Sequence, residues 1–144
     1  MVRITEKIKE YFEKNCPLLE GKRLGVNCLG EKIGDVGLKV IPCGDALKEY
    51  ADGGGLREFM FDICVRTPFD NDTQDAIGWA SFMEEMEKWI LNTASADDMV
   101  LDDGHEGINF EIVKTYGVSG ADRAGAKLSM RVRLIYEKIA DMTL

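Results

Sequence analysis

The side chains able to do chemistry are few in this sequence, and their spacing assembles no familiar catalytic group. His105 is the only histidine among 144 residues, so any serine or cysteine nucleophile activated by imidazole has to use it. It lies between glycines in an acidic stretch, where carboxylates favour the charged imidazolium that neither accepts a proton nor binds a metal. We therefore interpret His105 as a solvated loop side chain, and we expect no enzyme activity, no catalytic residue and no cofactor.

Two acidic segments are similar to metal sites in composition. Residues 70–75 begin like a calcium-binding loop, but the sixth position holds Asp75 in place of glycine and the twelfth holds Ser81 in place of glutamate. A helix cap is the better interpretation of this segment. The second segment, 94–107, is interpreted as a long solvated loop, with weak binding of a divalent ion left as an alternative. Its acidic residues are Asp97, Asp98, Asp102, Asp103 and Glu106.

The four cysteines are spaced without a CxxC pair, the arrangement that a zinc site would use. Two disulfides are conceivable, but a chain of this length builds a sufficient core and the sequence carries no export signal. We expect buried, reduced thiols in a protein made in a reducing cytoplasm. The cysteines are Cys16, Cys28, Cys43 and Cys64.

Composition places further limits on function. The chain has 18 basic and 26 acidic residues, a formal net charge of −8, and 45% of its residues are hydrophobic. This balance predicts one globular domain over residues 1–144. Acidity argues against sequence-independent nucleic-acid binding, which depends on lysine and arginine displacing counterions. No apolar run approaches the roughly 20 residues that span a bilayer, so we expect no membrane insertion.

Hydrophobic periodicity predicts two helices and four to five strands. Apolar residues recur at helical spacing from Ile4 to Phe12, and again over 73–93 from Trp79 to Ile90. Alternation predicts strands, clearest over 57–65, where Phe59, Phe61, Ile63 and Val65 share one face. The other expected strands are 23–29, 36–42, 108–112 and 128–136, with a glycine-rich turn over 117–125. The order α-β-β-β-α-β-β predicts an α+β fold, an antiparallel or mixed sheet with both helices on one face.

The last predicted strand carries basic side chains in an acidic protein. Lys127, Ser129, Arg131 and Arg133 alternate with apolar residues, so they share the face turned away from the core. One interpretation is a solvated sheet face. The other is that this row meets an acidic surface of another subunit, where charge complementarity sets the choice of partner.

Several segments, in this order, resemble a known family of small siphophage proteins. They are the first helix running into 16–19, then 26–30, Tyr50 with 52–54, the Phe59-x-Phe61 strand, 82–89 and 133–138. The chain resembles minor capsid or tail terminator (tail completion) proteins of phages and prophages of Gram-positive bacteria. The 94–107 segment is longer and more acidic than this family's pattern.

The resemblance implies a structural role in the virion. Tail terminators form a ring, usually a hexamer, which caps the tail tube, stops its elongation and provides the surface that joins the head. The implied partners are further copies of the chain, the tail tube protein and the head–tail connector. A closed ring uses head-to-tail contacts, so each subunit needs two different complementary patches.

We expect these patches in the 44–56 and 94–107 loops and on the basic strand. The interaction candidates are Lys127, Arg131, Arg133, Asp98, Asp102, Asp103 and Tyr50. Replacing both arginines with glutamate is expected to weaken the ring while leaving the fold intact. Two alternatives stay open: another neck component, such as a head-completion or head–tail joining protein, and a small ligand-binding or enzyme domain.

Overall fold

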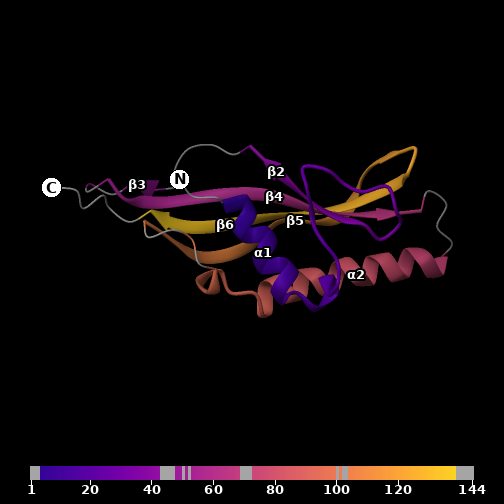
Figure 1. The fold of residues 1–144 in the computed structure, drawn as a ribbon, viewed down its shortest axis with the longest axis horizontal. Helices are drawn as coiled ribbons and strands as arrows, with labels where there is room; N and C mark the ends of the chain where they lie inside the picture. The colour runs from indigo at the N-terminus through magenta and orange to yellow at the C-terminus, as the bar shows by residue number, and fades with distance from the viewer. Residues whose placement is uncertain are drawn as a thin grey trace.

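Two helices cover one face of a mixed β-sheet in the computed structural model (Figure 1). The structure describes residues 4–42, 48–49, 51, 53–68, 73–99, 101 and 104–138. The α-helices are α1 (Ile4–Asn15) and α2 (Thr73–Asn92), and two short 3-10 helices are η1 (Pro17–Leu19) and η2 (Ala96–Asp98). The strands are β1 (Gly25–Val26), β2 (Val36–Ile41), β3 (Lys48–Glu49), β4 (Gly55–Thr67), β5 (His105–Asp122) and β6 (Gly125–Lys138).

The sheet follows the order β1-β2-β4-β6-β5, and β3 adds a short pairing to the first residues of β4. Strands β1 and β2 are parallel, and every other pairing between described strands is antiparallel. The predicted α+β class, the mixed sheet and the placement of both helices on one face are confirmed. The small strand β3 is an addition within a segment that the sequence assigns to a loop.

The core lies between the helices and one face of the sheet, and the alternation in β4 places it there. Phe61, Ile63 and Val65 are fully buried on that face. Phe12 of α1 is fully buried at the centre, with its ring centroid 5.9 Å from that of Phe61 and 5.3 Å from that of Trp89 on α2. The apolar stripes predicted for both helices therefore meet the predicted strand face.

The β5–β6 hairpin is much longer than the sequence predicts. The expected turn over 117–125 shrinks to residues 123–124, because β6 pairs with β4 along its whole length and β5 follows β6. Register shifts in β5 around Gly117 and Gly120 absorb the irregularity, which is the usual role of bulges. At the other end, β5 begins at His105, whose ring lies 5.8 Å from that of Tyr136. The interpretation of His105 as a solvated loop residue is therefore wrong.

The first strand is shorter than expected, whereas the start of the second helix is as expected. The first strand is confined to Gly25–Val26, because Asn27 takes a left-handed conformation (φ 55°) and its side chain accepts a hydrogen bond from the Val40 N–H. Helix α2 begins at Thr73 as expected, and the proposed capping residues 70–72 lie outside the described residues.

At Gly107, the backbone of β5 lies close to the backbone of η2. A Cβ atom at this position would lie 2.9 Å from the carbonyl carbon of Ala96 and closer still to its oxygen. We expect Gly107→Ala to lower the free energy of unfolding by about 2 kcal/mol, because η2 has to move to make room. Urea unfolding followed by circular dichroism measures the change.

Gly117, on the same strand, is the matched control. A Cβ atom there meets nothing within 4 Å, so Gly117→Ala should leave stability within about 0.5 kcal/mol of the wild type. Equal effects at the two positions would contradict the close approach of η2 to β5.

Candidate interaction surface

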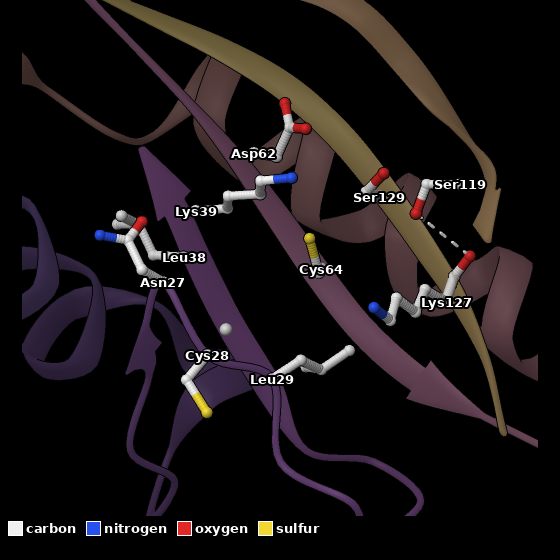
Figure 2. A pocket seen from close by; sticks show the side chains of 11 residues that line it. Asn27, Cys28, Leu29, Leu38, Lys39, Asp62, Cys64, Ser119, Lys127 and Ser129 are labelled. Carbon is white, nitrogen blue, oxygen red and sulfur yellow. Dashed lines mark hydrogen bonds between the residues drawn. The ribbon is translucent and has the colours of Figure 1, made fainter. Parts of the chain in front are cut away.

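The face of the sheet that the helices leave uncovered is hollowed near the β5–β6 turn. Two adjoining hollows, of about 260 and 390 Å³, share Lys39, Asp62, Ser119 and Ser129. We call the combined depression the open-face groove. Its floor is formed by β2, β4 and β6, and its two walls are the 27–29 segment and the far half of β5 (Figure 2). The groove is therefore built by strand alternation, since floor residues alternate with those that enter the core.

The groove is rich in cations although the protein is acidic. Lys39, Lys114, Lys127 and Arg131 line it, and Asp62 is its one lining carboxylate among the described residues. Arg131 donates to both oxygens of Asp62, with Nε–Oδ1 at 2.9 Å and Nη2–Oδ2 at 3.3 Å. Lys127 lies 3.7 Å from Asp122.

Lys39 and Lys114 are two groove lysines without an ion pair to any described carboxylate. Both side chains are exposed, and neither forms an ion pair with a carboxylate of the residues that the structure describes. Lys39 extends from β2 toward the middle of the groove (Figure 2). The groove therefore presents positive charge that no neighbouring side chain of the described chain neutralises.

Beside the groove, Arg133 belongs to a three-residue ion cluster. Its Nη1 lies 3.1 Å from Glu58 on β4, and its Nη2 lies 2.5 Å from Glu111 on β5. A hydrogen bond to Glu111 and a further one to Glu58 outweigh burial and raise the pKa of Arg133. The hydrogen bond to Asp62 likewise raises the pKa of Arg131.

These pairs change what the basic strand offers to a partner. Its charged side chains do lie together on the uncovered face, as the alternation predicts, but the carboxylates of β4 and β5 already bind both arginines. Glu58 and Asp62 are visible in the sequence on the outward face of β4. Only the register of β4 against β6, with Asp62 opposite Arg131, shows that they meet.

The acidic candidates lie elsewhere. Asp98 is exposed in η2, which packs against the start of β5, at the far end of that strand from the groove. At roughly 3.3 Å per residue, the separation along β5 reaches about 40 Å. Asp102, Asp103 and Tyr50 lie outside the described residues. The structure thus gathers Lys127 and Arg131 in one surface, places Arg133 next to it, and separates Asp98 from all three.

The cysteines are in three different environments. Cys16 is buried, with its thiol 3.5 Å from the sulfur of Met86. Burial, with a further contribution from nearby Asp62, raises the pKa of Cys64 in the groove to about 11, so this thiol stays protonated at neutral pH. Cys28 is exposed on the groove wall, so the expectation of buried thiols is wrong there. Cys43 lies outside the described residues.

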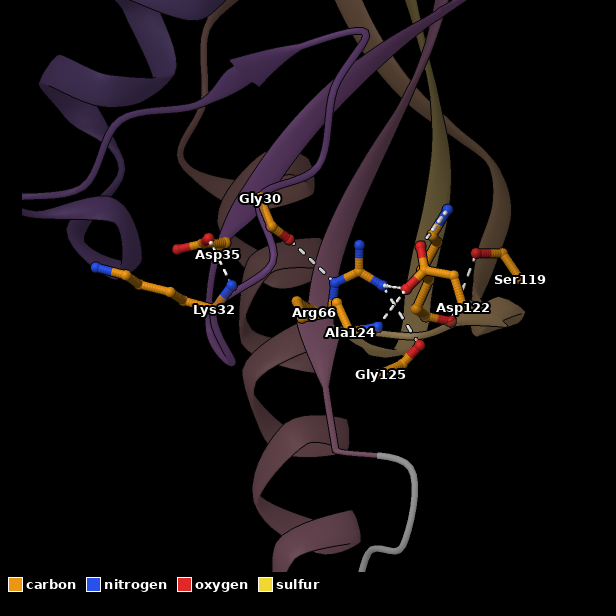
Figure 3. A network of polar contacts seen from close by, with 9 residues as sticks. Gly30, Lys32, Asp35, Arg66, Ser119, Asp122, Ala124 and Gly125 are labelled. Atoms are coloured by element: carbon orange, nitrogen blue, oxygen red, sulfur yellow. Dashed lines mark hydrogen bonds and ion pairs between the residues drawn. The ribbon is translucent and has the colours of Figure 1, made fainter.

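Arg66 holds the two walls of the groove to the sheet. This side chain is almost fully buried, and it donates to the Gly30 carbonyl at 3.0 Å and to Asp122 at 2.7 Å (Figure 3). The Ala124 N–H and then Arg66 lower the pKa of Asp122. Arg66 thereby links the loop after Asn27 to the β5–β6 turn. No sequence pattern distinguishes this arginine from those on the surface.

Other kinds of site receive no support from the described part of the chain. Within it, no group of three or more histidine, cysteine, aspartate or glutamate side chains is arranged to hold a metal ion. None of its helices has the length and apolarity needed to cross a membrane. The chain matches no model of a known protein family, and no curated protein matches it.

Proposed function

We propose that this chain is a structural protein of a phage virion: a tail terminator that forms a ring on the tail tube, stops tube elongation and provides the head-joining surface. The observation that carries the proposal is the uncovered sheet face, which presents lysines that form no ion pair with a described carboxylate, in a protein of net charge −8. The resemblance of its segments to minor capsid and tail terminator proteins supplies the biological setting, a virion assembled in the bacterial cytoplasm.

Association is the activity that such a surface supports. An uncovered antiparallel sheet face is often used to bind another protein, and a charged groove sets register and partner choice. The described residues offer two unlike patches, the basic open-face groove and the exposed acidic η2. Unlike patches give head-to-tail contacts, which close into a ring when the rotation between subunits allows it.

Deleting the gene from its phage or prophage tests the proposal. Electron microscopy of the lysate should show tails of uncontrolled length that lack heads, and a plasmid copy of the wild-type gene should restore normal tails. The purified chain should also bind the tail tube protein. Tails of normal length without attached heads, with binding to the portal or its adaptor, would replace the proposal with a head-completion role.

A further inference from the structure

The geometry points to a specific contact between two copies of this chain: the open-face groove of one copy receives η2 of the next. In this contact Asp97 and Asp98 of η2 meet Lys39 and Lys114 of the groove. The repetition of this contact around a ring rests on the proposed function. The contact itself can be tested with the purified chain alone.

The groove suits an anionic occupant. Lys39 on β2 and Lys114 on β5 are exposed on two sides of the same depression and form no ion pair with a described carboxylate. The third cation, Arg131, is bound to Asp62, and the fourth, Lys127, lies near Asp122. The charge available to a partner is therefore carried by the two lysines, and the hydroxyl of Ser129 beside them can donate a hydrogen bond to a carboxylate.

η2 presents two carboxylates on an anchored turn. Asp97 and Asp98 are exposed, and neither forms an ion pair with the described lysines and arginines. Ala96, which opens the turn, is buried against the backbone at Gly107, and Met99, which follows it, is buried as well. Because both ends of the turn are fixed, little conformational entropy is lost when its carboxylates are bound.

The placement of the two patches favours a head-to-tail contact. The groove lies on the uncovered face toward the β5–β6 turn, whereas η2 lies beside the start of β5 at the other end of the sheet (Figure 1). A two-fold contact through the groove would set like charges against each other, which opposes association. Joining the groove to η2 brings opposite charges together and leaves one free patch of each kind for the next copy.

Charge reversal and its restoration test the contact. Sedimentation equilibrium at low salt, at chain concentrations up to about 1 mM, should show association of the wild type that weakens with added salt. Lys39→Glu with Lys114→Glu, and separately Asp97→Lys with Asp98→Lys, should each weaken association by about tenfold or more. The variant carrying all four substitutions should associate within about threefold of the wild type, because opposite charges meet again.

Controls separate this contact from the effect of net charge. Lys32→Glu with Lys88→Glu changes the net charge equally at exposed sites outside the groove, and association should stay within about threefold of the wild type. Circular dichroism and urea unfolding verify that each variant is folded. If the variant with all four substitutions associates as weakly as the two double variants, the inference is overturned. It is also overturned if the wild type remains monomeric over the whole concentration range.

Cross-linking places the contact in space. Cys28 is an exposed thiol on the groove wall, so Asp98→Cys in a Cys43→Ser background should form disulfide-linked dimers and longer ladders under mild oxidation. Adding Cys28→Ser should abolish the ladder. A ladder that persists without Cys28, or none at all, overturns the inference.

The outcomes for the contact and for the proposed function are distinct. Suppose that the variant with all four substitutions regains association and the cross-linked ladder depends on Cys28, but tails keep their normal length when the gene is deleted. This result establishes the contact and refutes the terminator role. Tails of uncontrolled length after gene deletion, without a cross-linked ladder, support the terminator role and refute the contact. A groove that binds the tail tube protein but not a second copy also overturns the inference.

Discussion

Replacing Arg131 and Arg133 together with glutamate is expected to destabilise the fold by about 3 kcal/mol. The change removes a pair with Asp62 and a cluster with Glu58 and Glu111, and sets new carboxylates beside the existing ones. The side chains of Glu58 and Asp62 are only 12% and 14% exposed, so the repulsion is poorly screened. Leaving a buried charge unpaired costs 3–5 kcal/mol, and the partial exposure of both arginines places this variant at about the lower limit.

Urea unfolding with a neutral control isolates the cause. Arg131→Gln with Arg133→Gln breaks the same pairs without adding negative charge, and it should cost about half as much. Added salt should recover part of the stability of the glutamate variant and little of that of the glutamine variant. A glutamate variant as stable as the wild type would mean that the arginines are free to meet another subunit, as the alternation of basic residues along this strand suggests.

This prediction also determines which residues can be used to test association. If the ring is lost after both arginines are replaced with glutamate, the cause could be a destabilised fold as well as a lost interface. Lys39 and Lys114 are exposed and carry no described ion pair, so their reversal tests the groove with little effect on the core.

Phe12→Ala is expected to cost about 4 kcal/mol of unfolding free energy, enough to leave much of the chain unfolded near physiological temperature. The ring of Phe12 is fully buried and packs edge-on against Phe61, Trp89 and Phe110, with centroids 5.3 to 5.9 Å apart. Its removal leaves a cavity between α1, α2 and the sheet, and edge-to-face contacts add to the cost.

Phe12→Leu is the matched control, because leucine fills most of the space and should cost about 1.5 kcal/mol. Urea unfolding followed by tryptophan fluorescence suits both variants, since Trp89 belongs to the cluster. If alanine and leucine cost the same, the aromatic contacts contribute nothing measurable, and α1 is not fixed to the sheet through this ring.

Local patterns in the sequence are enough to assign the residues that face the core. Alternation in β4 assigns Phe61 and Ile63 to the buried face and Asp62 to the other, and helical spacing does the same for Met83 and Met86 of α2. These patterns are local, because a strand repeats every two residues and a helix every 3.6. The fold class and the face that carries the basic row follow from them.

Which charged side chains are paired within the chain depends on tertiary contacts that local patterns do not show. Pairing of β4 with β6 sets Asp62 opposite Arg131, and β5 brings Glu111 to Arg133, so both arginines are bound within the chain, while Lys39 and Lys114 form no ion pair with a described carboxylate. Each of these contacts joins residues far apart in the sequence through strand register, and register depends on the whole sheet, including the bulges in β5. The periodicity of residues within one strand does not specify how that strand aligns with its neighbours. The basic strand can therefore be identified from the sequence, whereas the groove can be identified only in the structure.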